Sequence, residues 1–422
     1  MVQKGYVECP TCGKVYQLKI QYDQNAQIFD WPICFECKEC GDILEFTYGQ
    51  KGLRPVGIDY KPQLGEPPVT TLGYSSSLPI TDEVYLKELN DAESMVLYSI
   101  FFNLQRGHFT SEEIHAFDIF LRQMQENFLP FRGVMKALLP IMVKGNTAAF
   151  SKKWAGFFDI KKYKPIETAR KMKEGFYELV EKSYLNIIPS AYYNNCYQRY
   201  VQPLFEYLKS SSFEDVKSLK ERLDESGKIS LWYKDTALPY VVDRLNDIQK
   251  IIPSMIYAST GVSDVQQRGD LKIVTISHKE ACSWYVKGYE ILIKGLKTLV
   301  GVNNLVENDD VDTFTNPKLG GVTTITKFAE LSPGKMIEHL ENYTTINDYL
   351  DGSLNNKVRN AAEHEGIRYD ATNQHITCYY DPNDGSKVYE LSLIALCRMC
   401  YVQLLHVIEI TLLARKIVEK AQ

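Results

Sequence analysis

Near its C-terminal end the chain runs Arg359-Asn360-Ala361-Ala362-Glu363-His364, between segments with helical patterning. Successive residues of an α-helix turn by about 100°, so Asn360 and His364 share one face, and Arg359 and Glu363 share the neighbouring face. About 140° separates Arg359 from His364. The long arginine side chain can bridge part of that angle. Alternatively, the Arg and His of one chain meet those of a second copy across a two-fold interface.

The helix that carries this motif is expected to be short. Asp351-Gly352-Ser353 predicts a break before it, and Ser353 or Asn355 could cap its start. Gly366 predicts its end soon after His364. The imidazole is therefore expected close to a helix end.

The residue types of the motif suit cleavage of RNA. Histidine titrates near neutrality and can transfer protons, and the planar guanidinium of arginine matches phosphate oxygens. Asparagine can orient an imidazole or donate to phosphate. Because RNA supplies its own 2′-hydroxyl nucleophile, an enzyme need only move protons and stabilise charge at phosphorus. Neither a catalytic metal nor an enzyme nucleophile is required.

Arg359, four intervening residues and His364 resemble the Arg-x4–6-His motif of HEPN domains, including the common Arg-Asn beginning. The resemblance covers roughly the last 150 residues, with helices expected at about 280–301, 334–350 and 388–418 and a short hairpin-like excursion before the last. It implies an α-helical bundle that dimerises and, in many members, acts as a metal-independent endoribonuclease. Arg359 would then stabilise the scissile phosphate, and His364 would transfer protons.

The residues around the motif add candidate site residues, and the resemblance implies a biological role. Asn360 occupies the polar position after the arginine, and Glu363 is a charged residue where many members have none; Arg368 and Tyr369 follow the motif helix and could contact RNA. The implied function is a cytoplasmic, regulated toxin of abortive infection that cuts tRNA or other cellular RNA as a homodimer, released by a phage-derived trigger or a regulatory protein. A non-catalytic RNA- or protein-binding module and an antitoxin-like scaffold are the alternatives.

Two CxxCG motifs near the N-terminus predict a metal site. Cys9 and Cys12 form the first pair, and Cys37 and Cys40 form the second. In such a knuckle two thiolates bend around one ion, and the glycine permits the tight turn. Strand-like segments at 15–20 and 43–48 complete the pattern of a structural zinc ribbon. Cys34 makes the second pair ambiguous, because Cys34 and Cys37 also form CxxC, but the Gly41-Asp42 that follows favours Cys37 and Cys40 as the ligands.

Composition sets the wider organisation. The chain has 422 residues, 45% of them hydrophobic, and a net charge of −5, so any RNA contact must rely on a local patch. The predicted fold is mainly α, with a zinc ribbon at 1–48, a linker at 49–81, a helical domain of unassigned role at 82–265 and a HEPN-like helical domain at 266–422. Helix breaks are expected near 144–146 and 210–212, and a loop at 302–325. The apolar run 391–413 carries Arg398, His406 and Glu409, which favours a buried helix over a membrane span.

Overall fold

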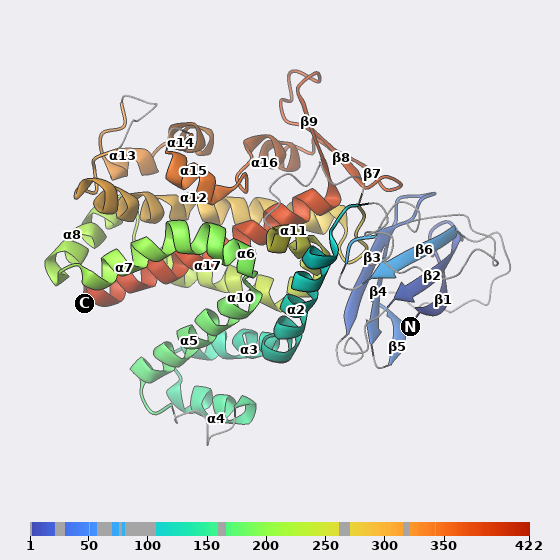
Figure 1. The fold of residues 1–422 in the computed structure, drawn as a ribbon, viewed down its shortest axis with the longest axis horizontal. Coiled ribbons are helices and arrows are strands. Elements are labelled where there is room, and N and C mark those ends of the chain that lie inside the picture. The colour runs from blue at the N-terminus through green and yellow to red at the C-terminus, as the bar shows by residue number, and fades with distance from the viewer. Residues whose placement is uncertain are drawn as a thin grey trace. The chain divides into compact units, whose positions relative to one another are not determined.

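The computed structural model describes residues 2–21, 30–49, 51–56, 70–75, 78–80, 107–158, 166–260, 271–314, 321–341 and 343–422. The described chain is mostly helical, with a C-terminal helical region and a small N-terminal β region (Figure 1), which confirms the predicted fold class. The first part of the helical domain predicted at 82–265, up to residue 106, lies outside the described residues.

The chain divides into two compact units that interleave along the sequence. Unit 1 comprises Met1–Phe117, Ile248–Tyr289 and Ser353–Val402, and unit 2 comprises Asp118–Asp247, Glu290–Gly352 and Gln403–Gln422. This division differs from the consecutive domains expected from the sequence. Its physical reason is that two long helices, α12 (His278–Asn308) and α17 (Leu393–Lys420), each contribute their first turns to unit 1 and the remainder to unit 2.

In the described residues the N-terminal β region contains two three-stranded sheets. The first has the order β1-β2-β6, in which β2 pairs antiparallel with β1 and parallel with β6; the second is the antiparallel sheet β3-β4-β5. The strands predicted at 15–20 and 43–48 are β2 and β4. The segment 49–81, expected as a linker, contains β5 and β6. The strand bounds are β1 Val2–Glu8, β2 Val15–Gln21, β3 Trp31–Glu36, β4 Ile43–Gly49, β5 Gly52–Pro55 and β6 Thr70–Ser75.

The segment of residues 271–277, which precedes α12, connects the β region to the C-terminal part of unit 1. The amide of Cys34 in β3 donates to the carbonyl of Val274 at 2.8 Å. On the other side, the Gln374 side chain accepts from the amide of Ile273 at 2.9 Å and donates to its carbonyl at 2.6 Å. Both sides of the segment are therefore fixed by hydrogen bonds within unit 1.

The C-terminal part of unit 1 contains the motif helix α16 and a three-stranded antiparallel meander, β7-β8-β9, where a simpler hairpin-like excursion was expected. The final helix was predicted from about residue 388, but it begins at Leu393. Residues Val388–Ser392 form β9 instead, because they pair with β8. The bounds are η6 Ile248–Ser254, α11 Met255–Thr260, α16 Asn356–Glu363, β7 Ile367–Asp370, β8 His375–Tyr379 and β9 Val388–Ser392.

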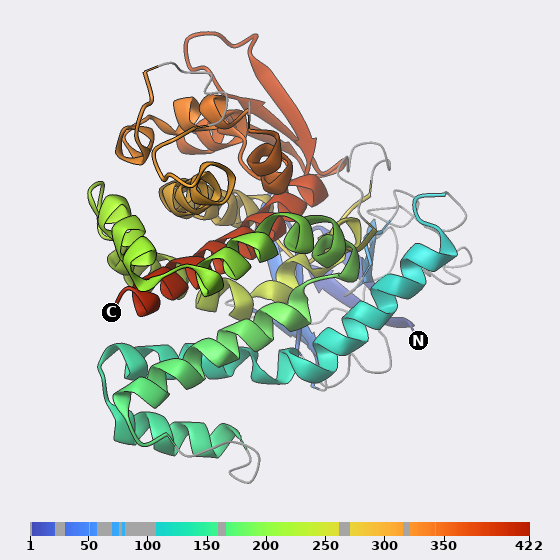
Figure 2. The ribbon, with the colours of Figure 1, turned by 60° about the vertical axis from the view of Figure 1, so that its left-hand side comes forward.

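Unit 2 is helical in its described residues, and α3, α4 and α5 pack against one another (Figure 2). Helix α2 (Ser111–Asn127) enters it from unit 1. Two segments, η4 and η5, are π-helical. The remaining bounds are η3 Leu129–Phe131, α3 Arg132–Val143, α4 Thr147–Phe157, α5 Ala169–Ile187, α6 Ser190–Tyr192, η4 Tyr193–Val201, α7 Gln202–Ser210, α8 Phe213–Asp224, α9 Ile229–Leu231, η5 Trp232–Ala237, α10 Leu238–Asn246, α13 Ile325–Ala329, α14 Pro333–Leu340 and α15 Thr344–Leu350.

The helix breaks in unit 2 follow local capping chemistry. Asn146 caps α4 by accepting from the amide of Ala149 at 3.0 Å, and Ser212 forms a capping box with Asp215 at the start of α8. These are the two breaks predicted at 144–146 and 210–212. Two other expectations were wrong: α12 continues to Asn308 through the first part of the predicted 302–325 loop, and the helix expected at 334–350 is divided into α14 and α15.

Helix α17 contains the long apolar run of the sequence. Among the described helices it is the one whose length and composition would suffice to cross a membrane, and 89% of its most apolar window is buried within the protein. Burial of this kind is typical of a core helix, as the charged and polar residues within the run indicated.

Candidate functional site

The four cysteines of the two CxxCG motifs lie together. Their sulfur atoms all fall within 4.8 Å of one another, with 3.6 Å between Cys9 and Cys40 and 3.5 Å between Cys12 and Cys37. Four sulfurs bound to tetrahedral zinc at about 2.3 Å would be roughly 3.8 Å apart. The cluster therefore fits a metal ion such as zinc.

Each pair lies at the turn of a β-hairpin, the first between β1 and β2 and the second between β3 and β4. Gly13 and Gly41 adopt φ of +75° and +73° and donate their amides to the carbonyls of Cys9 and Cys37 at 2.9 and 2.8 Å. Only glycine adopts this left-handed backbone without a steric cost. The pattern predicted from the sequence thus has a matching local geometry in both hairpins.

Tyr16 and Cys34 lie near the cluster: the first contacts one of its sulfurs, and the second is excluded from it. The buried Tyr16 donates its hydroxyl to the sulfur of Cys37 at 3.2 Å and accepts from the amide of Lys38 at 2.8 Å. Burial would raise the pKa of the Cys37 thiol, but the Tyr16 hydroxyl and nearby backbone amides lower it to about 7. Cys34 is not part of the cluster, since its sulfur lies 3.9 Å from a carboxylate oxygen of Glu45 on β4.

The motif occupies helix α16 and its C-terminal boundary. Asn355 caps the helix by accepting from the amides of Lys357 and Val358, which confirms one of the two predicted caps. Two tyrosines on α12 hold the start of α16 in place. The Tyr285 hydroxyl accepts a hydrogen bond from the amide of Asn355 and donates one to its carbonyl, and the Tyr289 hydroxyl donates to the side-chain oxygen of Asn356. The sequence analysis did not identify these tyrosines, although their i, i+4 spacing places them on one helix face.

The end of α16 differs in detail from the expectation. The residue with left-handed backbone is Glu365 at φ +55°, not Gly366. Gly366 is needed for another reason: a Cβ atom there would lie 2.2 Å from the carbonyl oxygen of Tyr379 on β8. Its carbonyl also accepts from the amide of Tyr379 at 2.7 Å. The glycine therefore lets the meander approach the end of the motif helix.

Arg359 is held by its own helix. Its guanidinium forms an ion pair with Glu363 at 2.7 Å and donates to the amide oxygen of Asn360 at 3.3 Å. The Arg359 and Glu363 side chains are 25% and 28% exposed. The buried Nε atom of Arg359 has no hydrogen-bond partner among the described residues. The predicted shared face of Arg359 and Glu363 is thus observed as an ion pair.

His364 is the C-cap of α16 and is exposed. Within the described chain, no hydrogen bond or ion pair involves its imidazole, and none joins it to Arg359 or to Asn360. One chain therefore places the imidazole and the guanidinium on the same short helix without bringing them into contact.

The two predicted neighbours lie on β7 and face different partners. The Arg368 guanidinium lies over the ring of Tyr379 at 4.9 Å. Tyr369 stacks on His278, with ring centroids 4.4 Å apart, and His278 in turn contacts the carboxylate of Glu36 in β3. Tyr369 thus contributes to the connection between the meander and the β region.

A cation and two aromatic rings that the sequence analysis did not select lie beside the motif. The ammonium group of Lys357, on α16, lies 5.4 Å from the ring of Tyr380 and 5.7 Å from the ring of Tyr389. Cation and ring contacts of this kind are also suited to phosphate and base recognition. The alternation of basic and aromatic residues around the meander could have indicated this surface.

Unit 2 contains a buried carboxylate that no motif indicated. Glu409 of α17 is 1% exposed and accepts hydrogen bonds from the hydroxyls of Tyr184, Tyr192 and Tyr349. Burial raises its pKa to about 7, although the three hydroxyls oppose the shift. The carboxylate is buried and its hydrogen bonds come from tyrosines of the same unit, so we assign the cluster to the stability of unit 2.

No protein-family model, curated protein or solved structure matches the chain. The candidate sites are therefore interpreted from their own geometry and chemistry.

Proposed function

We propose that the chain is an endoribonuclease that needs no catalytic metal, and that each active site combines Arg359 of one copy with His364 of a second. The observation that carries the proposal is the placement of the motif on α16: His364 is exposed at the helix end with no side-chain partner, and Arg359 remains a quarter exposed. Both side chains are therefore accessible to a phosphate, but within one chain they are not in contact with each other.

The chemistry requires only these groups and the substrate. The 2′-oxygen of the RNA attacks the adjacent phosphorus, and its proton passes to a histidine imidazole acting as base. The bond from phosphorus to the 5′-oxygen breaks, and that oxygen takes up a proton. The products carry a 2′,3′-cyclic phosphate and a 5′-hydroxyl. Arg359 would stabilise the additional negative charge on the phosphate oxygens during the reaction.

In this proposal Glu363 restrains Arg359 until a phosphate arrives. Helical i, i+4 ion pairs contribute only a few tenths of a kcal/mol when exposed. A bidentate contact between arginine and phosphate is stronger, because both partners are charged and their geometries match. RNA can thus displace Glu363 from the guanidinium at little cost.

For the cysteine cluster we propose a structural zinc ion held by Cys9, Cys12, Cys37 and Cys40. Four thiolates leave no open coordination position for a substrate, which is typical of a structural site. Such an ion would link the hairpin turns of the two small sheets and add its binding free energy to their folding. A regulated toxin that acts on tRNA or other cellular RNA in the cytoplasm is the biological role that we propose with this chemistry.

The test is cleavage of labelled total tRNA by the purified protein in the presence of EDTA. We expect products with 2′,3′-cyclic phosphate ends, which are lost in His364→Ala and Arg359→Ala. His115→Ala, which removes an exposed histidine on α2, is the matched control and should cleave normally. A folded wild type that never cleaves RNA, even with phage components supplied, or His364→Ala activity equal to that of the control, would refute the proposal.

One observation favours a second function, a non-catalytic module that binds RNA or protein. Arg359 is already engaged by Glu363 and Asn360, as expected for an arginine that stabilises its own helix. Glu363→Gln separates the two functions. An enzyme should cleave RNA faster when Arg359 is released, whereas a binding module should show no cleavage in either form.

A further inference from the structure

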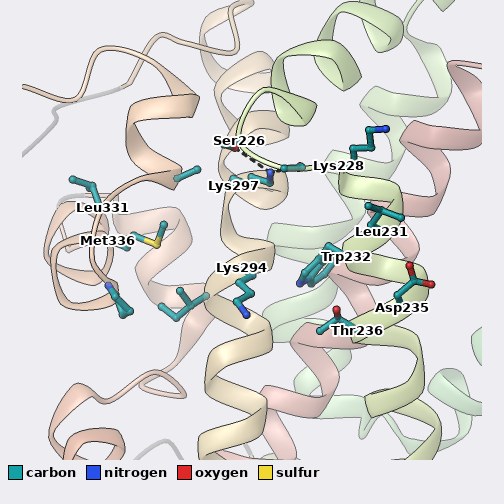
Figure 3. A pocket seen from close by; sticks show the side chains of 14 residues that line it. Ser226, Lys228, Leu231, Trp232, Asp235, Thr236, Lys294, Lys297, Leu331 and Met336 are labelled. Carbon is teal, nitrogen blue, oxygen red and sulfur yellow. Dashed lines mark hydrogen bonds between the residues drawn. The ribbon is translucent and has the colours of Figure 1, made fainter.

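A pocket of about 530 Å³ lies within unit 2 (Figure 3). It is bounded by the loop between α8 and α9, by η5, by the outer face of α12 and by the segment from α13 to α14. Its volume is in the range of small-molecule sites, about 300–1,000 Å³. Neither the cysteine cluster nor the α16 motif contributes to it.

Trp232 forms one wall in a fixed orientation. Its indole N–H donates to the carbonyl of Ile291 at 3.2 Å, and its ring lies directly over Gly295 of α12, where a Cβ atom would come within 2.6 Å of the ring. Glycine inside a helix costs about 1 kcal/mol relative to alanine. The position of Trp232 therefore depends on a residue that is otherwise unfavourable in α12.

Trp232 is also the first residue of the π-helix η5, which contributes Asp235 to the same wall. Single π-helical turns are rare and occur frequently at functional sites. Asp235 forms no ion pair with any residue of the described ranges. The wall thus presents a flat ring and a carboxylate that is available to a ligand.

Two lysines on α12 give the pocket a positive charge. Lys297 is 7% exposed and donates to the carbonyls of Leu223 and Gly227 at 2.8 and 2.7 Å and to the hydroxyl of Ser226 at 3.0 Å. These three neutral acceptors use all three N–H groups of the ammonium, and the Asp224 carboxylate is near enough to interact with its charge, so Lys297 contributes to the pocket through its field rather than through a free donor. Lys294, one turn earlier, is exposed and forms no ion pair within the part of the chain that the structure describes.

The opposite wall is apolar. Leu331 and Met336 lie across the face of α12 from Trp232, and Lys294 stands on α12 between the two sides (Figure 3). The pocket therefore combines a rigid aromatic ring, an apolar wall and an excess of lysine over acid. A flat ring that carries an anionic group is the ligand chemistry that satisfies all three features.

We propose that this pocket binds a nucleotide, with the base between Trp232 and the apolar wall and the phosphate beside the exposed Lys294, in the electrostatic field of the buried Lys297. The proposal is independent of the ribonuclease function, because all the residues that carry it belong to unit 2. A free mononucleotide and the end of an RNA strand share this chemistry and are distinguished below.

Trp232 supplies the signal for the test. Of the four tryptophans, Trp31, Trp154 and Trp284 are 1%, 7% and 0% exposed, whereas Trp232 is half-buried and lines the pocket. We expect 5′-mononucleotides to change the tryptophan emission of the intact protein, and adenosine or inorganic phosphate to do so only weakly. Trp232→Phe should abolish the change.

Lys294→Gln should weaken nucleotide affinity about tenfold in calorimetry, as expected for one lost contact to phosphate. Lys335→Gln is the matched control, because this exposed lysine on α14 lies outside the pocket lining and its substitution changes the charge equally. Binding of mononucleotides identifies a free ligand, and binding only of a short oligoribonucleotide identifies a strand end. The proposal is overturned if neither class changes Trp232 emission, or if both lysine variants have the same affinity.

Discussion

The buried carboxylate of Glu409 makes a quantitative prediction about stability and pH. Glu409 faces tyrosines from α5, α6 and α15, and the ring of His406 on its own helix lies 4.2 Å from that of Tyr349. No Lys or Arg of the described residues forms a salt bridge with Glu409. The ionised carboxylate is therefore compensated by hydroxyl groups alone.

Folding raises the pKa of Glu409 from 4.5 to about 7. A raised pKa means that the folded state binds the proton more tightly than the unfolded state. The resulting stability is fully present below about pH 4.5 and is lost as the pH rises through about 7. At 1.36 kcal/mol per pKa unit the complete loss is about 3 kcal/mol, most of which falls between pH 5 and pH 8.

Glu409→Gln isolates this contribution, because the amide stays neutral and its oxygen can still accept hydrogen bonds from the tyrosines. Between pH 5 and pH 8 we expect the stability of the variant to rise relative to that of the wild type by about 2 to 3 kcal/mol, measured as the difference in free energy of unfolding in urea. Glu290→Gln, an exposed position on α12, should show no such gain. Parallel curves for wild type and Glu409→Gln across this range would refute the reasoning.

Three further predictions concern unit 1. Cys12→Ser should reduce bound zinc from about one ion per chain, measured by elemental analysis, whereas Cys34→Ala should leave it unchanged; equal zinc in both variants would contradict the ligand assignment. Gly366→Ala should destabilise the protein by at least 2 kcal/mol in urea, roughly the cost of overpacking, because the clash is with the backbone carbonyl of Tyr379. Gly385→Ala, where a Cβ meets nothing within 4 Å, should be near neutral. Glu363→Gln should increase the rate of RNA cleavage in a single-turnover assay, and an unchanged rate would show that this residue does not restrain the arginine.

Features that depend on residues close together in the sequence could be predicted. The CxxCG knuckles, the Asn355 cap and the ion pair between Arg359 and Glu363 each arise within a few residues, where turn geometry and helical spacing decide the structure. The glycine after Cys40 already favoured Cys40 over Cys34 as a ligand, and the tertiary structure agrees with that choice. Cys34 lies in β3 opposite Glu45, and this strand pairing directs its side chain away from the cluster.

Features that depend on distant residues were not predicted. Strand β6 pairs in parallel with β2, so Tyr16 lies opposite Thr70, and no local pattern specifies such a register. Residues Val388–Ser392 are compatible with a helix, but pairing with β8 makes them a strand. The Glu409 cluster joins residues more than 200 positions apart. Its tyrosines could be recognised as core residues but not as partners of one carboxylate.

The central claim is that arginine and histidine from different copies complete each active site. Arg359→Ala and His364→Ala proteins, each inactive alone, can be mixed, allowed to exchange subunits and assayed on labelled tRNA. A mixed dimer retains one intact site, because one copy supplies the arginine and the other supplies the histidine. The account predicts recovery of about a quarter of wild-type activity at random exchange. Mixed dimers that form without any recovery of cleavage would contradict it.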